Sequence, residues 1–230
     1  MEKTTLLLAD DHTIVRQGLR ALLQQDDGIQ VVGEAETGRQ AVQLARKLLP
    51  EIVVMDIAMP MLNGLEATRQ IVRDTPVTKV LILSCYNDGE YVRRATEAGA
   101  SGYLLKQTAA DDLLKAIREV QHGNAYFSPA VSKQLLESYR DNAVARVTGE
   151  KNVDSLTSRE LEVLQLIAEG QANKQIAAEL CLSIKTIEKH RQQLMNKLNI
   201  HDIAGLTRYA VARGVVETIQ NFARFELEFA

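Results

Sequence analysis

Short apolar runs alternate with longer segments of helical spacing along the first half of the chain. Runs rich in Val, Ile or Leu have the length of buried strands and cover Thr5–Ala9, Ile29–Glu34, Glu51–Met55, Lys79–Ser84 and Gly102–Leu105. After the first run, apolar residues recur about every 3.6 positions, at Ile14, Leu19, Leu22 and Leu23. Further helices are expected at about residues 38–49, 64–73, 89–98 and 109–121. This alternation predicts an α/β domain over residues 1–122, with a doubly wound, five-stranded parallel sheet covered by helices on both faces.

The second half has a different pattern, because no strand is predicted after residue 122. Residues 123–154 are expected to form a linker with one helix, Ser128–Tyr139, which has Pro129 at its first position. Apolar residues at helical spacing then predict an all-α domain of four helices over residues 155–214. Thr157 and Glu160 have the spacing of a capping box at the first of these helices. The pattern leaves the structure of the tail, residues 215–230, open.

Composition does not change this two-domain prediction, but it argues against several kinds of site and segment. The chain has 46% hydrophobic and 25% charged residues, which is typical of a globular protein. Its cysteines, Cys85 and Cys181, lie far apart, and the histidines are scattered, so neither a disulfide nor a zinc site is predicted. The first apolar run is too short for a signal peptide, and no run approaches the ~20 residues of a membrane span. We therefore expect a cytoplasmic protein without membrane association.

Polar side chains follow the ends of four of the five predicted strands. Asp10 and Asp11 follow the first strand and Asp56 the third, whereas Ser84 ends the fourth and Lys106 follows the fifth. Because ligands of open parallel sheets bind at the carboxyl ends of the strands, we expect these side chains to converge. An oxygen-only cluster favours Mg²⁺. Carboxylates, a divalent ion, a lysine and a hydroxyl together suit phosphoryl transfer, with one carboxylate as the nucleophile.

Together with Met55–Pro60, Gly64 and Gly102–Lys106, these positions resemble the receiver domain of response regulators over about residues 1–122. The resemblance implies a flavodoxin-like strand order, 2-1-3-4-5, and makes Asp56 the phosphoacceptor for a sensor histidine kinase. It implies that the Mg²⁺ ligands are Asp11, Asp56, the backbone carbonyl of Ala58 and, through water, Asp10. It also implies that the phosphoryl group is contacted by Lys106 and Ser84, and that the switch residue, moving inward after Ser84, is Tyr103.

This sequence departs from the receiver pattern at one conspicuous position, because Gln107 stands where many receivers have a proline after the lysine. Taken singly, the other positions also have ordinary structural interpretations. Asp10 and Asp11 could cap the following helix, Asp56 could be a loop carboxylate, and Tyr103 could be a core aromatic. The joint occurrence of these residues at the expected strand ends favours the phosphoacceptor interpretation.

Charge is distributed unevenly along the chain. The net charge of −3 and the pI of about 5.9 argue weakly against nucleic-acid binding. Between Ser183 and Leu198, however, four basic residues against one acidic residue give a local charge of +3. In this predicted helix Ile187, Leu194 and Leu198 are expected to face the core. The opposite side, with donors such as Lys189, then suits the major groove of DNA.

The segments Leu156–Glu160, Ile167–Gly170, Asn173–Ala177 and Ser183–His190 resemble the LuxR-type helix-turn-helix domain of the NarL/FixJ response regulators. The resemblance implies that the base-reading residues are Glu188, Lys189 and Gln192. It implies that the phosphate-contacting residues are Lys174, Lys185, Thr186 and Arg191. Many related proteins have a basic residue in place of Glu188, and an acid there could accept a hydrogen bond from cytosine or pair with a neighbouring base.

The two resemblances together predict a phosphorylation-dependent transcription regulator that binds promoter DNA. Phosphorylation of Asp56 is expected to permit dimerisation and DNA binding, and the protein is not expected to turn over an external substrate. Three alternatives stay open: a phosphatase of the haloacid-dehalogenase type, a protein-interaction module, and a receiver that works without phosphorylation. The first is disfavoured because such enzymes place a second Asp where this chain has Ala58.

Overall fold

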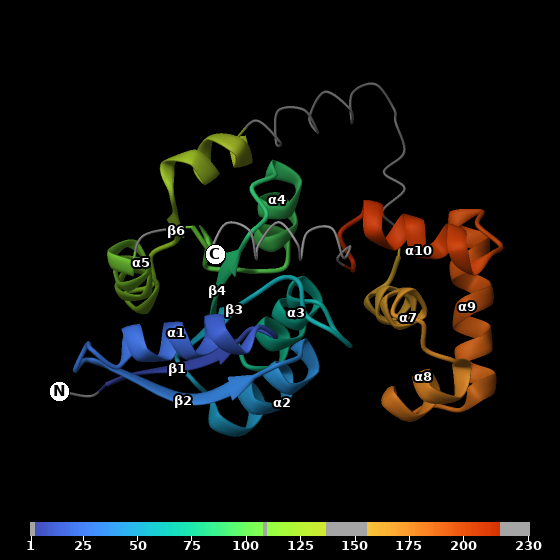
Figure 1. Cartoon of the computed structure of the whole chain (residues 1–230), viewed down its shortest axis with the longest axis horizontal. Helices are drawn as coiled ribbons and strands as arrows, with labels where there is room; N and C mark the ends of the chain where they lie inside the picture. The colour runs from blue at the N-terminus through green and yellow to red at the C-terminus, as the bar shows by residue number, and fades with distance from the viewer. Residues whose placement is uncertain (1–2, 108–109, 137–155, 217–230) are drawn as a thin grey trace. The chain divides into compact units, whose positions relative to one another are not determined.

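The computed structural model describes residues 3–107, 110–136 and 156–216. The chain divides into two compact units between Lys151 and Asn152. Within the described residues, the first unit contains the sheet and its covering helices, and the second is helical (Figure 1). No helix in these three ranges is long and apolar enough to cross a membrane.

The sheet of the first unit is parallel throughout, with the strand order β2-β1-β3-β4-β5-β6. Its strands are β1 Thr4–Ala9, β2 Ile29–Ala35, β3 Ile52–Met55, β4 Lys79–Ser84, β5 Gly102–Leu105 and β6 Tyr126–Phe127. The first five confirm the predicted strands and their order. The strand β6 was not predicted, because a two-residue edge strand has no periodicity in the sequence. A Cβ at Gly102 would lie 2.7 Å from the Tyr126 carbonyl oxygen. The absence of a side chain at Gly102 therefore allows β6 to pair closely with β5.

Helices cover both faces of the sheet, as predicted. They are α1 Thr13–Leu23, α2 Gly38–Leu48, α3 Gly64–Asp74, α4 Gly89–Glu97 and α5 Ala110–Gln121. Because side chains alternate in direction along a strand, Leu6 and Leu8 belong to one apolar core and Leu7 to the other. The core around Leu6 includes residues of α1 and α5, and the core around Leu7 includes residues of α2, α3 and α4.

Part of the predicted linker packs on the first unit. Residues 129–136 are helical, and Val131 is fully buried in the same core as Leu7, with Leu135 packed against that core. The side-chain amide of Gln134 donates a hydrogen bond, 2.9 Å long, to the carbonyl of Asn87 between β4 and α4. The rest of the predicted helix, up to residue 139, lies outside the described residues.

The second unit contains the four predicted helices, α7 Ser158–Ala168, α8 Asn173–Glu179, α9 Ile184–Leu198 and α10 Ile203–Ala212. The capping box of α7 is confirmed, because Glu160 N donates to Thr157 Oγ1 at 3.3 Å and Thr157 N to Glu160 Oε2 at 2.8 Å. Ser183 is the N-cap of α9, since its Oγ accepts from Thr186 N at 3.1 Å. The buried apolar side chains include Val163, Leu164, Ile176, Ile187, Leu194 and Leu206.

Candidate functional site

The carboxyl ends of β1, β3 and β5 bring together three acids and a lysine. Asp10 and Asp11 follow β1, Asp56 follows the adjacent β3, and Lys106 follows β5. Asp10 and Asp56 are buried, with 3% and 4% of their surface exposed. One ligand atom from each of Asp10, Asp11, His12 and Asp56 lies within 4.8 Å of the others. We call Asp10, Asp11, Asp56 and Lys106 the acidic pocket.

Lys106 bridges the two buried acids. Its Nζ lies 2.7 Å from Asp10 Oδ2 and 3.0 Å from Asp56 Oδ2. Burial alone would lower the pKa of Lys106, but the carboxylates of Asp56 and Asp10 raise it above its usual value. Burial raises the pKa of Asp56 to about 7, and Lys106 opposes this rise. Whether Asp56 is ionised near neutral pH therefore depends on the charges beside it, above all on Lys106.

Asp10 differs electrostatically from Asp56, although both are buried. Burial raises the pKa of Asp10, but hydrogen bonds from His12 and the charge of Lys106 outweigh it and lower that pKa below its usual value. Asp10 Oδ1 accepts from the backbone N of His12 at 2.9 Å. Asp10 is thus favoured as a fixed negative charge beside Asp56.

The donor set of the pocket fits a magnesium ion. Three carboxylates converge from two adjacent strand ends, and Mg²⁺ binds through one or two carboxylates while keeping several waters. Ala58, whose carbonyl the sequence analysis also assigned to the metal, is half-buried two residues after Asp56. The loop after Asp56 folds back so tightly that a Cβ at Gly64 would lie 1.8 Å from the Asp56 carbonyl oxygen. Glycine at this position therefore permits the shape of the loop.

Ser84 and Tyr103 meet at the backbone of Tyr86. Ser84 Oγ accepts a hydrogen bond from Tyr86 N at 3.2 Å, and the Tyr103 hydroxyl donates to Tyr86 O at 2.7 Å. Both side chains are fully buried, and burial raises the pKa of Tyr103 well above its usual value. The Tyr86 ring stacks on Tyr91 with 4.2 Å between the ring centroids. The strand end that carries Ser84 is thus connected to Tyr103 through one residue of the β4–α4 loop.

One side of α9 presents polar side chains to solvent. Lys185, Glu188, Lys189 and Gln192 are exposed, as is Lys174 on α8, whereas Thr186 and Arg191 are half-buried. Ile187 and Leu194 are fully buried on the other side, as predicted. Leu198, also predicted to face the core, is only half-buried. We call Lys185, Glu188, Lys189 and Gln192 the exposed face of α9.

Two of the basic residues on α9 bind neighbouring helices. Lys197 Nζ lies 2.7 Å from Glu160 Oε2 of α7, and Arg191 Nη1 donates to Asn173 Oδ1 of α8 at 2.6 Å. Because Glu160 neutralises Lys197, the charge of +3 read from the sequence overstates the charge that α9 offers to DNA, whereas Arg191 keeps its charge beside the neutral side chain of Asn173. Both contacts also fix the orientation of α9.

Comparisons with known proteins match both units. A family described as "Response regulator receiver domain" matches residues 6–118, and one described as "Bacterial regulatory proteins, luxR family" matches residues 154–210. The transcriptional regulatory protein DegU of Brevibacillus brevis is 37% identical over 230 residues, which cover 95% of this chain and 94% of DegU. The chain belongs to the response regulators with a luxR-type DNA-binding domain. It is a transcription regulator with a receiver domain.

Solved structures agree with this family. RcsB of Salmonella enterica serovar Typhimurium, bound to promoter rprA in the presence of the phosphomimetic BeF3−, has a TM-score of 0.57 and 28% identity; the match covers 90% of this chain and 98% of that one. A structure of two RcsB dimers bound to two parallel DNAs has a TM-score of 0.55 and 29% identity, with the same coverage. The first unit is accordingly the receiver domain, and the second is the DNA-binding domain.

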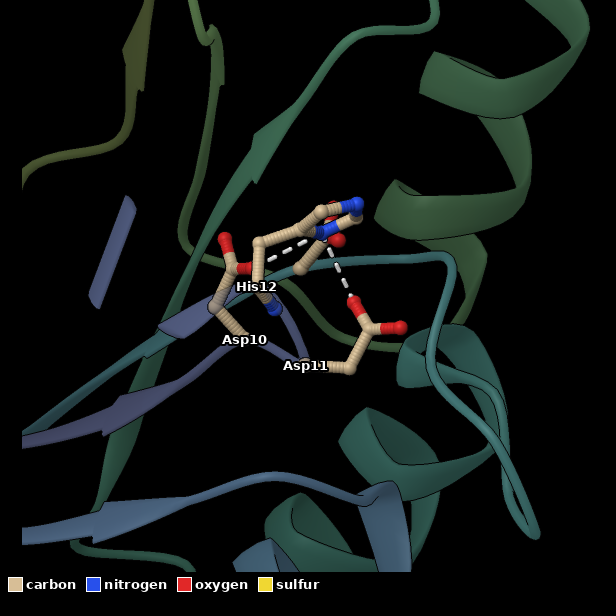
Figure 2. A group of neighbouring side chains, drawn as sticks. Asp10, Asp11 and His12 are labelled. Atoms are coloured by element: carbon tan, nitrogen blue, oxygen red, sulfur yellow. Dashed lines mark hydrogen bonds and ion pairs between the residues drawn. The ribbon is translucent and has the colours of Figure 1, made fainter. Parts of the chain in front are cut away.

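Sequence reasoning about this response regulator missed His12. Figure 2 shows its ring between the Asp10 and Asp11 carboxylates. His12 Nδ1 lies 3.2 Å from Asp10 Oδ1 and 2.9 Å from Asp11 Oδ1, and hydrogen bonds to these acids raise the pKa of His12 to about 10. His12 is also the N-cap residue of α1, without a side-chain cap, so neither acid occupies the N-cap position of this helix. Its position directly after two acids was the available signal.

Sequence reasoning also missed Arg16 of α1. This arginine is buried, and its Nη1 donates to the backbone carbonyl of Asp10 at 2.6 Å. Its position in an amphipathic helix gives no sign that it is buried. Its other partners, Glu34 and Glu36, are brought close by the return of the chain through β2, which local periodicity does not reveal.

Proposed function

We propose that Asp56 accepts a phosphoryl group from a sensor histidine kinase, and that this modification controls promoter binding through α9. The observation that carries the proposal is the position of Asp56. It is buried beside Asp10, with its Oδ2 3.0 Å from the Lys106 ammonium. A buried carboxylate next to a fixed cation suits transfer of an anionic group, because the cation can hold the added charge.

In the proposed reaction, a carboxylate oxygen of Asp56 attacks phosphorus while the bond from phosphorus to the kinase histidine nitrogen breaks. The imidazole leaves with the electron pair of that bond, and no oxidant or other co-reactant is needed. Lys106 favours the ionised form of Asp56 and then holds a phosphoryl oxygen. Mg²⁺, held by Asp11, Asp56, the Ala58 carbonyl and, through water, Asp10, would neutralise the charge on the transferred group.

Ser84 and Tyr103 are proposed to report the new charge. In this proposal the Ser84 hydroxyl turns to a phosphoryl oxygen and gives up its bond with Tyr86 N. The Tyr103 hydroxyl, bonded to Tyr86 O, follows the resulting movement of the loop. Asn87, the next residue, accepts from Gln134, so the same movement reaches the helical segment 129–136. We propose this route as the start of the coupling to the DNA-binding domain.

The exposed face of α9 is proposed to enter the major groove. Its Glu188, Lys189 and Gln192 would contact base edges, and the proposed phosphate contacts are Lys174, Lys185, Thr186 and Arg191. Phosphorylation is proposed to favour a homodimer that binds two half-sites, which is supported by the RcsB dimers bound to DNA. We place the DNA-binding domain at residues 155–214 and extend the receiver from 1–122 to residue 136, because Val131 is buried in its core.

The first experiment maps the phosphorylated residue. The full chain is incubated with Mg²⁺ and acetyl phosphate, and its intact mass and peptide masses are measured for wild type and Asp56→Asn. We expect one phosphoryl group on Asp56 in wild type and none in the variant. Asp27→Asn is the control, because Asp27 is an exposed acid outside the pocket. Equal phosphorylation of Asp56→Asn would contradict the proposal, and sustained release of inorganic phosphate from small phosphomonoesters would favour the phosphatase alternative.

The second experiment tests the control of DNA binding. The same proteins, with and without BeF3−, are used to select fragments of genomic DNA, and the enriched fragments are sequenced. We expect BeF3− to increase enrichment for wild type but not for Asp56→Asn. Equal enrichment under both conditions would support a receiver that works without phosphorylation. An absence of any enriched fragment would support the protein-interaction alternative.

A further inference from the structure

Arg16 is a buried charge that the proposed phosphoryl transfer does not use. The residue lies on α1 with 5% of its surface exposed. Each of its guanidinium nitrogens has an acceptor: Nη1 donates to Asp10 O at 2.6 Å, Nε to Glu34 Oε2 at 3.2 Å and Nη2 to Glu36 Oε1 at 2.7 Å. A buried arginine with this complete set of partners has a fixed orientation.

The charge of Arg16 is already compensated outside the acidic pocket. Glu34 and Glu36 bind Arg16, and Glu34 also binds Arg20 with its other oxygen. Two arginines and two glutamates thus form a group without net charge. Arg16 is therefore poorly suited to offset the charges of the pocket acids. Its bond to the Asp10 carbonyl instead affects the position of the backbone that carries these acids.

That bond fixes the peptide unit between Asp10 and Asp11. The Asp10 N–H donates to Ala35 O at the end of β2, and the Asp10 carbonyl accepts from Arg16, whose other partners flank Ala35. The Asp10 residue is thus fastened to β2 through both of its backbone groups. Because a peptide unit is planar, holding its carbonyl also sets the position from which the Asp11 side chain starts.

We propose that Arg16 is a positioning residue for the acidic pocket. Its guanidinium holds the Asp10–Asp11 peptide so that the two carboxylates stand ready for a divalent cation beside Asp56. This inference rests on the magnesium site of the proposed function. It requires the forked geometry of arginine and not only a positive charge, because a lysine ammonium cannot reach the carbonyl and both glutamates in the same planar arrangement.

The test compares Mg²⁺ dissociation constants, measured by isothermal titration calorimetry on the full chain. Arg16→Lys keeps the charge and loses the fork, and residues that orient metal ligands typically contribute about 10–100-fold to affinity. We expect Arg16→Lys to bind Mg²⁺ about tenfold more weakly than wild type. Arg20→Ala is the matched control. Arg20 lies one turn further along α1 and binds the same Glu34, but its side chain is 51% exposed and makes no hydrogen bond to the Asp10 carbonyl, which is bound by Arg16. We expect Arg20→Ala to bind Mg²⁺ as wild type does.

Unchanged Mg²⁺ affinity of Arg16→Lys would overturn the inference, as would an equal loss in Arg20→Ala. Urea unfolding without Mg²⁺ establishes that each variant is folded. Should Arg16→Lys not fold, Glu36→Gln replaces it, because this change weakens one anchor of the guanidinium and leaves the Asp10 contact in place. An intermediate loss of affinity is then expected, and wild-type affinity would overturn the inference. If wild type itself binds no Mg²⁺, the proposed metal site fails, and Arg16 has no metal ligands to position.

Discussion

The acidic pocket and the exposed face of α9 both depend on charged side chains, but they are built in opposite ways. The pocket collects its charges from the ends of three strands and buries them against one another: Lys106 has only 6% of its side chain exposed and touches two acids. The face of α9 takes its charges from consecutive turns of one helix and leaves them in solvent. One site is created by the tertiary fold and the other by helical periodicity.

This difference determines what a single substitution does. Removing one partner in the pocket leaves another charge buried without compensation, which is costly. Removing one side chain from the exposed face of α9 is expected to delete one proposed contact with DNA and to leave the domain intact. The paired residues of α9, Arg191 and Lys197, lie between these extremes, because they fasten the helix to α8 and α7.

Lys106→Met tests the burial of the pocket charges. Without Mg²⁺ at pH 7, we expect the free energy of unfolding of the receiver to fall by about 3–5 kcal/mol, because Asp10 and Asp56 lose their buried partner. The loss should shrink as the pH falls: carboxylates whose folded pKa is raised bind protons in the folded state first, which stabilises it at lower pH. Added Mg²⁺ should restore part of the stability.

The measurement for Lys106→Met is urea unfolding followed by circular dichroism at pH 7 and pH 5. Lys47→Met is the control, because Lys47 is an exposed lysine of α2. An equal loss at both pH values, or an equal loss in the control, would contradict the interpretation of Lys106 as the counter-charge of two buried acids.

Val131→Ala tests whether residues 129–136 belong to the receiver. Val131 is fully buried, so removing its two methyl groups should lower the free energy of unfolding by about 2 kcal/mol through lost burial and a residual cavity. Leu136→Ala on the same helical segment is the control, since Leu136 is 61% exposed; its effect should stay within about 0.5 kcal/mol. Urea unfolding distinguishes the two. If both substitutions changed the free energy of unfolding equally little, residues 129–136 would belong to the linker and not to the receiver.

Lys189→Ala tests the exposed face of α9. We expect DNA affinity to fall about tenfold, with relaxed preference at one base pair, because a base-contacting side chain contributes about 1–3 kcal/mol. Lys185→Ala, at a proposed phosphate contact, should weaken binding to all sequences uniformly and reduce the salt slope by about one. Fluorescence anisotropy with a selected fragment and a scrambled one measures both effects. Lys47→Ala is the charge-matched control, and identical behaviour of all three variants would refute the assignment.

The smallest effect is expected from acidification of the DNA-binding domain. Burial raises the pKa of Glu160, but Lys197 and Thr157 together lower it below the usual 4.5. Such a group contributes stability that is present above its usual pKa and lost as the pH falls through its lowered value. Because Lys197 is 38% exposed, solvent screening limits this contribution to about 1 kcal/mol or less.

Amide hydrogen exchange of α7 and α9, measured between pH 7 and pH 3, tests this pH dependence. We expect wild type to lose protection below about pH 4.5 and Glu160→Gln to show a flatter profile. Glu188→Gln is the control because Glu188 is exposed on α9. A profile flattened equally by both substitutions would show that the Glu160–Lys197 pair is not the cause.

The sequence alone determined features that depend on neighbouring residues in the chain. Apolar runs located β1 to β5, the spacing of Thr157 and Glu160 located the start of α7, and the helical period placed Ile187 and Leu194 in the core. Strand ends also located the pocket acids, because parallel strands bring their carboxyl ends to the same edge of a sheet. Local periodicity and one topological rule were sufficient for these predictions.

Only the tertiary structure decided which charges meet. The contacts of Lys106 with Asp10 and Asp56, of Arg16 with Glu34 and of Lys197 with Glu160 join positions far apart in the chain. Such contacts have no local period, and neither does the short edge strand β6. Their physical basis is burial: a charge or a backbone group removed from water needs a partner, and the partner is whichever group the folded chain brings within reach.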